Sequence, residues 1–351
     1  MKKDRKLSFF IIISAILSSA VLTDSSTASV ATVEEQEPKY KLTARPSEQF
    51  FIERSPSVND LVSNVTVGVI QGVDSNPLLD STHKADSYTQ EMVDVHYRYP
   101  LFKSLFGSTD SKFGFNVTNV NYYRINDVDI FDAAVDANIE QELLDSLTMT
   151  AGYVFEMMWF PHDTNGTYAA NQVNVSIRQK LAGWLYQKTT YRFLIKNFTC
   201  NKVLLGNKTR GEPRREDSRN VFENELGAYI GKSTKVKIVN QFYFNESNYT
   251  YVDFYDYFNY KVGGSVIQFF TKKFYCIGGF SYQRRNYDSR YEADRQSRQK
   301  DNLYTVTGSL LYDLNKNVSI FINYSHSENH SNEPLDRYVD SLYSAGVYYA
   351  F

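Results

Sequence analysis

The sequence has few cysteines, no excess of basic residues and almost no long apolar run. Its 351 residues include only two cysteines, Cys200 and Cys276, too few for a disulfide-stabilised scaffold. Lys and Arg number 38 against 40 Asp and Glu, so a net charge of -2 offers no basic surface for nucleic acid. Beyond the extreme N-terminus, no segment approaches the ~20 consecutive apolar residues of a membrane-spanning helix. These features argue against a helical membrane protein and against a nucleic-acid-binding protein.

Aromatic residues, in contrast, are abundant. The chain has 28 Tyr, 24 Phe and 2 Trp, which make 15% of the sequence, and 42% of all residues are hydrophobic. Large apolar side chains in this number cannot all stay in water, which excludes disorder over most of the chain. The sequence therefore predicts an ordered fold that places an unusually large number of aromatic side chains.

The N-terminus has the pattern of an export signal. Basic residues precede an apolar segment, Leu7 to Leu17, and small residues follow it up to Ala20 and again up to Ala31. This pattern predicts a cleaved signal peptide over residues 1–31, with cleavage after Ala20 left open. An uncleaved anchoring helix is the alternative, although the apolar stretch is shorter than a span requires. Residues 32–60 are polar and aperiodic, so they are predicted to form a periplasmic linker.

From Leu61 to Phe351 the chain alternates apolar and polar side chains in segments of about ten residues, a period of two that predicts β-strands. Fourteen such segments can be counted, and twelve or sixteen strands also fit. Short breaks such as 231–233 alternate with longer polar ones such as 328–340. Short turns at one end and long loops at the other are what a transmembrane antiparallel β-barrel requires. Residues 61–351 are therefore predicted to form an all-β barrel with short periplasmic turns and longer extracellular loops.

A soluble β-sandwich would alternate as well, but it does not require aromatic residues at strand ends. Here aromatic residues gather towards the ends of segments, as in Tyr153 to Phe160 and at Tyr304 and Tyr312. Amphipathic rings take such positions at the two interfaces of a membrane. This distribution favours the membrane barrel.

The polar sides of these strands would face the lumen, and they are rich in charge. Because strands follow one another around a barrel, the middle strands would form a basic wall and the early strands an acidic one. Arg98 and Arg124 are placed among the early strands. The predicted basic wall comprises Arg178, Lys180, Lys188, Arg192, Lys196, Lys235, Lys237 and Lys261, and the acidic wall Asp94, Asp136, Glu140 and Glu156. The sequence thus predicts a weak preference for anions, unless these charges pair across strands and fill a closed lumen.

A fourteen-stranded barrel is intermediate between narrow barrels filled by side chains and wide porins, so its loops matter. The segment Asn201 to Arg219 carries six basic residues and is a candidate constricting loop. A surface loop that contacts anionic lipopolysaccharide is an equal alternative. Ser325, His326, Glu328 and His330 lie close in sequence, but their spacing specifies no catalytic triad, and no zinc-type spacing occurs. The sequence therefore predicts no enzyme, no metal and no cofactor.

The C-terminal segment from Tyr343 to Phe351 resembles the last strand of bacterial outer-membrane proteins. Tyr343, Val347, Tyr349 and Phe351 lie at alternate or terminal positions of this signal. The resemblance implies that the barrel-assembly machinery recognises it. More loosely, Val67 to Pro77, which contains Asp-Ser-Asn, and Asn323 to Asn332 are similar to segments of the putative β-barrel porin 2 group. The barrel part of surface-lipoprotein assembly modulators has similar features, but the residues before Leu61 show no helical repeat pattern, which counts against a lipoprotein translocator.

These observations lead to an outer-membrane, porin-like channel of a Gram-negative-type bacterium for passive diffusion of small hydrophilic solutes. Export of an exopolysaccharide is one alternative, and a structural or adhesive barrel with a plugged lumen is another. The expected partners are outer-membrane lipid, lipopolysaccharide and the assembly machinery. Formation of a homo-oligomer is left open.

Overall fold

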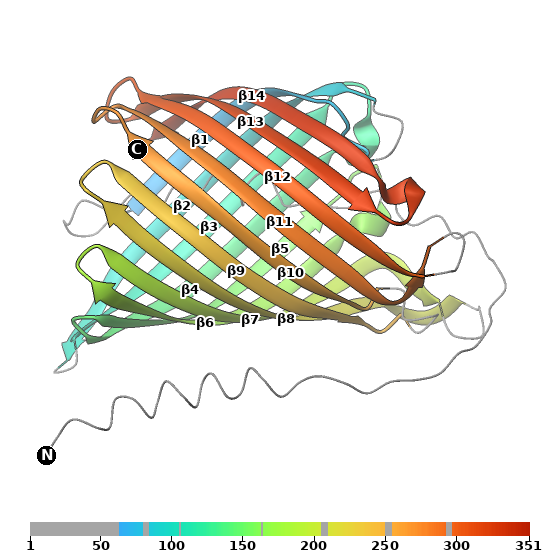
Figure 1. The fold of residues 1–351 in the computed structure, drawn as a ribbon, viewed down its shortest axis with the longest axis horizontal. Coiled ribbons are helices and arrows are strands. Elements are labelled where there is room, and N and C mark those ends of the chain that lie inside the picture. Colours follow the sequence, from blue (N-terminus) through green and yellow to red (C-terminus); the bar gives the residue numbers. More distant parts are fainter. Residues whose placement is uncertain are drawn as a thin grey trace, which may run out of the picture. The chain divides into compact units, whose positions relative to one another are not determined.

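The computed structural model describes residues 63–79, 84–104, 107–162, 164–204, 210–249, 255–292 and 297–351. The predicted signal peptide and linker lie outside these residues. The described chain forms one closed antiparallel barrel in which each strand pairs with its neighbours in sequence and β1 pairs with β14 (Figure 1). Within the described ranges, no helix is long and apolar enough to cross a membrane. The prediction of a fourteen-stranded barrel is confirmed.

The strands have the following bounds: β1 Ser63–Asp74, β2 Asp86–Ser104, β3 Gly107–Tyr122, β4 Ile130–Leu144, β5 Leu147–Trp159, β6 Tyr168–Ala182, β7 Leu185–Leu204, β8 Arg210–Ile230, β9 Thr234–Ser247, β10 Tyr257–Phe269, β11 Phe274–Tyr291, β12 Arg298–Asp313, β13 Val318–Ser331 and β14 Tyr338–Ala350. Three short 3-10 helices, η1 Asn126–Val128, η2 Thr164–Gly166 and η3 Pro334–Asp336, interrupt the longer connections. Figure 1 shows all three at one end of the barrel and the tight turns with the C-terminus at the other. We call these the loop end and the turn end.

The predicted loop Asn201 to Arg219 is wrong over most of its length. Residues up to Leu204 continue β7, and residues from Arg210 onward belong to β8, so the two strands form a long hairpin. Their register shifts between Asn197 and Lys202 mark a bulge in β7. The hairpin extends the barrel wall at the loop end.

Apolar side chains alternate outward along every strand. On β5, Tyr153, Phe155, Met157 and Trp159 are exposed, whereas Glu156 and Met158 between them are buried. On β14, Val339, Tyr343, Val347 and Tyr349 are exposed, and the series continues to Phe351, the residue after the strand. This arrangement follows from the two-residue period of a strand, which turns successive side chains to opposite faces.

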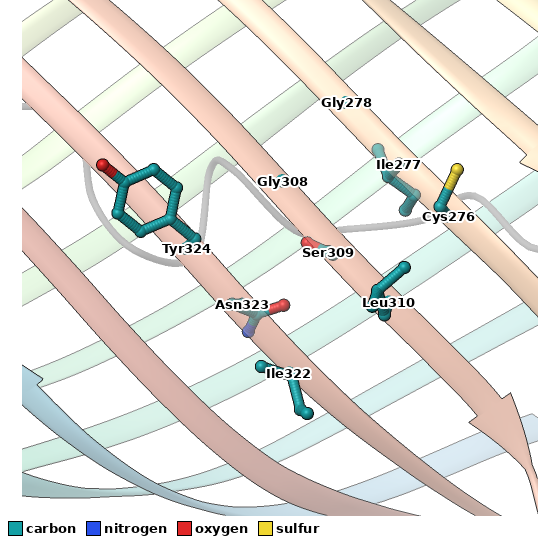
Figure 2. Close-up of a pocket in the computed structure, with 9 residues that line it drawn as sticks. All are labelled: Cys276, Ile277, Gly278, Gly308, Ser309, Leu310, Ile322, Asn323 and Tyr324. Atoms are coloured by element: carbon teal, nitrogen blue, oxygen red, sulfur yellow. The ribbon is translucent and has the colours of Figure 1, made fainter.

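An apolar hollow of about 340 Å³ lies on the outer surface of β11, β12 and β13 (Figure 2). Gly278 and Gly308 face each other across the β11–β12 pair, and a methyl group added at either would meet no atom within 4 Å. Cys276 and Leu310 lie beside them on the same strands. The hollow is therefore a place where two paired outward positions lack side chains.

The inner face is not polar throughout. Ile70, Tyr275, Leu311 and Phe321 form a buried apolar cluster, against which Tyr348 and two isoleucines pack. A second cluster, made of Met158, Phe160, Tyr168 and Ala170, lies on β5 and β6 and at the residue that follows β5. These side chains occupy inward positions that the alternating pattern assigns to the polar face.

The seam between β1 and β14 is fastened at the loop end by the Asp74-Ser75-Asn76 motif. Ser75 Oγ donates a hydrogen bond to Asp340 Oδ1 at 3.1 Å, and the Ser341 amide donates to Ser75 Oγ at 2.6 Å. The Asn76 amide donates to Asp74 Oδ1 at 2.8 Å, and its side chain donates to the Val339 carbonyl at 3.2 Å. The motif thus ties the first strand to the last.

Candidate functional site: the inner wall of the barrel

The eight residues of the predicted basic wall occupy inward register positions on four strands. On β6, for example, Arg178 alternates with the exposed outward residues Val175 and Ile177. Lys180 lies at the turn end, where its Nζ donates to the Asp145 carbonyl at 3.1 Å. The set places Arg178 and Lys180 on β6, Lys188, Arg192 and Lys196 on β7, Lys235 and Lys237 on β9, and Lys261 on β10.

Two of these cations are compensated by acids on β8, the strand between them. Arg192 Nη2 lies 2.7 Å from Glu223 Oε2, which also accepts a hydrogen bond from Gln241 at 2.8 Å. Lys237 Nζ lies 3.5 Å from Glu225 Oε2. The middle of the barrel wall is therefore a row of ion pairs with additional cations, and it is less uniformly basic than the chain order of the cations suggests.

Three further cations lie over aromatic rings. The Arg178 guanidinium carbon is 4.1 Å from the centre of the Tyr186 ring, and Lys196 Nζ is 4.1 Å from that of Tyr168. Lys235 Nζ lies 5.6 Å from the Tyr229 ring. A cation above a ring face is stabilised by the ring quadrupole and keeps its full charge. The rings therefore hold these cations against the wall, and the rings themselves carry no charge that would neutralise the cations.

The predicted acidic residues also lie on the inner face, each with a neighbour that donates to it. Glu140 Oε2 is 2.6 Å from Lys112 Nζ, and Asp94 Oδ2 is 2.9 Å from His96 Nε2.

The other two acids have neutral donors. Asn138 donates to Asp136 Oδ1 at 2.6 Å, and Tyr168 OH donates to Glu156 Oε1 at 2.8 Å. Arg98 pairs with Asp110 on the same side of the barrel. The early strands therefore hold basic partners as well, which weakens the separation of charge that the sequence predicts.

Arg124 is not on an early strand. β3 ends at Tyr122, and the amides of Arg124 and Ile125 both donate to Asp86 Oδ2 at 2.8 Å. The placement of Arg124 among the inward charges is thus wrong, because two backbone hydrogen bonds to a carboxylate turn the chain there.

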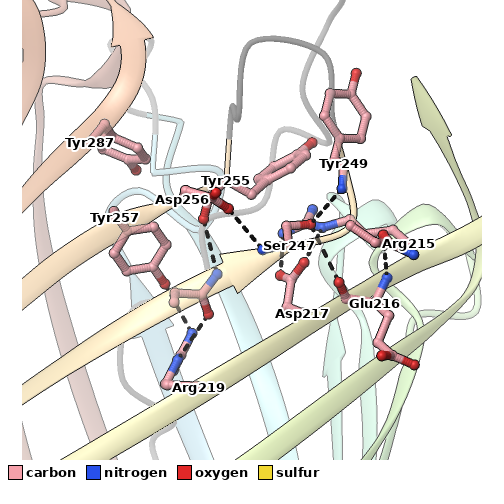
Figure 3. A network of polar contacts seen from close by, with 12 residues as sticks. Arg215, Glu216, Asp217, Arg219, Ser247, Tyr249, Tyr255, Asp256, Tyr257 and Tyr287 are labelled. Carbon is pink, nitrogen blue, oxygen red and sulfur yellow. Dashed lines mark hydrogen bonds and ion pairs between the residues drawn. The ribbon is translucent and has the colours of Figure 1, made fainter. Parts of the chain in front are cut away.

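The loop end carries a network of arginine and tyrosine residues that the sequence pattern does not predict (Figure 3). Buried Arg215 forms two hydrogen bonds to Asp217, at 2.9 and 2.5 Å. Its guanidinium carbon lies 3.2 Å from the centre of the Tyr255 ring and 4.3 Å from that of Phe198. Arg215 is thus both paired and stacked.

Arg219 and Arg285 differ, because their hydrogen-bond acceptors are neutral. Arg219 donates to Asn245 Oδ1 at 3.1 Å and to Tyr257 OH at 2.9 Å. Arg285 donates to Tyr287 OH at 3.1 Å, and its guanidinium carbon lies 4.7 Å from the centre of the Tyr257 ring. Tyr257 is therefore shared by the two arginines.

The β13–β14 connection is pinned to the inner wall. Buried Asp336, in η3, accepts a hydrogen bond from Arg290 Nη2 at 3.1 Å and another from Gln299. The Asp336 carbonyl accepts from Asn329 Nδ2 at 2.6 Å. Contacts with β11, β12 and β13 thus hold this connection at the mouth.

The four residues considered for catalysis do not come together. Ser325 is buried on the inner side of β13, and His326 is on the opposite face, where its Nδ1 lies 2.8 Å from Ser341 Oγ. His330 pairs with Glu328 at 2.9 Å. In the described part of the chain, no group of three or more His, Cys, Asp or Glu residues could hold a metal ion.

Comparison with known proteins gives one matching family model and several solved structures of outer-membrane proteins. The sequence profile of the putative beta-barrel porin 2 family matches residues 230–351. No curated protein matches the chain. A loop-deletion variant of OmpT, an outer membrane protein of Vibrio cholerae, is 11% identical, with a TM-score of 0.47, and the match covers 84% of this chain and all of that one.

Two other solved structures show a similar degree of likeness. An anion-selective porin from Comamonas acidovorans is 8% identical with a TM-score of 0.46, covering 83% of this chain and 99% of that one. An outer membrane channel from Pseudomonas putida F1 is 7% identical with a TM-score of 0.44, covering 86% and 100%. The chain is thus a closed fourteen-stranded β-barrel whose last third resembles the putative β-barrel porin 2 family.

Proposed function

We propose that this chain is an outer-membrane channel of a Gram-negative-type bacterium for passive diffusion of small hydrophilic solutes, with a weak preference for anions. The observation that carries the proposal is the contrast between the two faces of the barrel. Exposed apolar side chains cover the outside, whereas ion pairs and stacked cations line much of the inside. A closed barrel with these faces suits a bilayer, because every strand has two hydrogen-bonded neighbours.

The height of the apolar band supports this location. Outward apolar residues run from Tyr304 on β12 to Leu314, the residue after that strand. This span is ~33 Å along a strand and about 25 Å along the axis of a barrel with strands tilted by ~40°. Outward tyrosines, at Tyr282, Tyr304, Tyr324 and Tyr343, mark the edge nearer the loop end. Aromatic girdles of this kind lie at membrane interfaces.

The preference for anions follows from cations that have no carboxylate partner. Among the residues that the structure describes, Lys188 and Lys261 form no ion pair, and Arg178 is stacked on a ring. Unpaired charge on a low-dielectric wall concentrates counter-ions in the lumen. The paired residues Arg192 and Glu223 contribute little net field, so the proposed preference is weak.

Planar-bilayer conductance of the refolded chain without residues 1–31 tests the proposal. Stable current steps are expected, and in a potassium chloride gradient the reversal potential is expected to have the sign of chloride selectivity. Absence of steps from a protein that is folded by circular dichroism would refute an open channel. A reversal potential of the opposite sign would refute the preference for anions.

The absence of current would favour the plugged barrel, for which the inner clusters around Phe321 and Phe160 are candidate obstructions. A partner-dependent current would favour polymer export. We further propose that lipopolysaccharide surrounds the loop end, that the assembly machinery recognises the C-terminal strand and that the signal peptide is removed on export. Cross-linking in native membranes would decide whether the barrel forms homo-oligomers.

A further inference from the structure

The inner wall near the loop end contains two arginines without an acidic partner beside an asparagine without any partner. Within the described residues, neither Arg219 nor Arg285 forms an ion pair. Asn259 is completely buried, and neither its Oδ1 nor its Nδ2 has a hydrogen-bond partner. Arg285 Nε is buried without a partner as well.

The register places these groups side by side. Asn259 on β10 pairs with Tyr243 on β9 and with Arg285 on β11. The Arg219 guanidinium carbon lies 4.5 Å from the centre of the Tyr243 ring. Asn259 therefore has Arg285 on one side and, on the other, a tyrosine that Arg219 covers. Figure 3 shows Arg219 beneath Tyr257, which both arginines contact. Two cations and an unsatisfied amide therefore converge on one patch.

Nearby carboxylates are engaged elsewhere. Asp301 is the register partner of Arg285, but its Oδ1 accepts hydrogen bonds from Gln299 at 3.0 Å and from Ser331 at 2.7 Å. Asp217 pairs with Arg215. The field of Asp301 offsets part of the positive charge, and the guanidinium N–H groups of Arg219 and Arg285 that do not donate to Asn245, Tyr257 or Tyr287 remain available.

This arrangement is costly unless something binds there. A buried amide without hydrogen bonds destabilises a fold, and a guanidinium group that is partly withdrawn from water needs an anion or several acceptors. A stability-driven sequence would place an apolar residue at position 259. An unsatisfied asparagine between two unpaired arginines is what a binding subsite requires.

We propose that Arg219, Arg285 and Asn259 form a subsite for a hydroxy-carboxylate group, such as that of an acidic sugar. The planar fork of an arginine matches a carboxylate, and Asn259 Nδ2 supplies a further donor. Asn259 Oδ1 is an acceptor and needs a ligand group that donates a hydrogen bond. A hydroxyl group next to the carboxylate can donate, whereas a fully ionised phosphate cannot. The ring of Tyr257, which is partly exposed, offers flat apolar surface to the carbon skeleton of the solute.

The subsite rests on the proposed function in that it faces the lumen of a channel, and it names the class of solute. Arg219 and Arg285 are partly exposed, and their long side chains can turn to admit a small anion to Asn259. Binding here would raise the local concentration of acidic solutes at the mouth.

Saturation-transfer NMR on the refolded full barrel in detergent, with glucuronate, glucose and propionate as probes, tests the subsite without requiring conductance. Glucuronate is expected to bind, glucose to give no signal above that of empty micelles, and propionate to bind severalfold more weakly than glucuronate. Equal binding of glucose would overturn the role of the arginines. Equal binding of propionate would overturn the role of the hydroxyl group.

Variants separate a binding role from a structural one. Arg285→Gln is expected to weaken glucuronate binding about tenfold. Arg284→Gln is the matched control, because Arg284 is adjacent in sequence but exposed on the outer face. Asn259→Leu is expected to abolish binding while the barrel becomes as stable as the wild type or more stable, since it removes two unsatisfied atoms. Unchanged glucuronate binding in Asn259→Leu would refute the subsite.

Conductance then distinguishes the two proposals. A chain that binds glucuronate but passes no current would refute the open channel and leave the subsite standing. A chain that conducts but does not bind glucuronate would refute the subsite alone.

Discussion

Ser75 Oγ donates a hydrogen bond to Asp340 Oδ1 at 3.1 Å, although 265 positions separate the two residues in the sequence. The contact lies at the loop end of the seam where β1 meets β14, with Asn76 completely buried beside it. In the sequence, the short Asp-Ser-Asn motif supports only a loose family resemblance. In the structure, it connects the first strand to the last by hydrogen bonds.

Replacing Ser75 by Ala should destabilise the barrel by about 1 kcal/mol, and Asn76→Ala should do so by about 1–3 kcal/mol, because buried partners lose their hydrogen bonds. The temperature at which the folded band unfolds in detergent gels measures this. Ser233→Ala, in an exposed tight turn, is the control and should have no effect. An equal loss in the control would show that the seam contacts are not special.

The seam should also weaken as pH rises. Asp340 lies beyond Tyr343 toward the loop end, where outward positions of β13 and β14 carry the polar residues Glu328 and Ser341. Burial, followed by the neighbouring charge of Asp74, raises the pKa of its carboxyl group to about 8. The folded chain therefore keeps a proton that the unfolded chain loses above its ordinary pKa of 3.8.

Since the folded state binds more protons in this window, the free energy of unfolding should fall as pH rises from about 4 to about 8 and then level off. Asp340→Asn should remove this dependence and be the more stable form at pH 8. Denaturant unfolding at several pH values measures it. A parallel pH profile in the variant would contradict the assignment to Asp340.

Two glycines on neighbouring parts of the wall should respond in opposite ways to alanine. Gly308 has open space for a methyl group in the outer hollow, so Gly308→Ala should stabilise by about 0.4–1 kcal/mol through reduced freedom of the unfolded chain. A methyl group at Gly346 would lie 2.6 Å from the Val69 carbonyl oxygen, across the seam. Gly346→Ala should therefore destabilise, and urea unfolding of the pair would reveal the contrast.

The unpaired cations of the inner wall should set ion selectivity. Replacing Lys188 and Lys261 together by Glu should lower the chloride-to-potassium permeability ratio by about twofold to fourfold, given screened charges ~10 Å from the axis. Reversal potentials measure the ratio. The matched control is the double change of Lys232 and Lys272 to Glu in tight turns, which should leave it nearly unaltered. Equal shifts would mean that overall charge, and not the wall, determines selectivity.

The terminal aromatic residue should matter for assembly in cells more than for stability. Phe351 is 72% exposed, and its ring forms a T-shaped pair with that of Tyr349, with the ring centres 4.7 Å apart. Phe351→Ser should reduce the amount of barrel in the outer membrane severalfold, whereas the refolded protein should unfold within about 0.5 kcal/mol of the wild type. Phe270→Ser, exposed at the same end, is the control. A similar reduction with Phe270→Ser would argue against recognition of the C-terminus.

The sequence could predict the fold because one face of every strand is apolar. Residues such as Val347 and Tyr349 recur with a period of two, and that period alone assigns strand and face. The pattern fails where both faces are polar, as around Arg219, whose outward neighbours Ser218 and Asn220 give no alternation. The sequence pattern therefore predicts a loop where the structure has the extended hairpin of β7 and β8.

Pairing of charges could not be predicted for a different reason. The contact of Arg192 with Glu223 depends on the register of β7 against β8, and a shift by one residue would turn a side chain to the other face. Composition and periodicity do not specify that register. For the same reason the sequence does not predict that Arg219, Arg285 and Asn259 lie together, because they come from three strands whose register is not specified.

The closing seam also dictates an order of events during biogenesis. Thirteen of the fourteen pairings join strands that follow each other along the chain, and only β1 with β14 joins the two extremes. Strands that are neighbours in sequence can pair as soon as both are in place in the barrel, but β1 keeps an open edge until β14 has been added. The contacts of Ser75 and Asn76 are then the final step, and a chain that lacks them would leave an unpaired edge exposed to other chains.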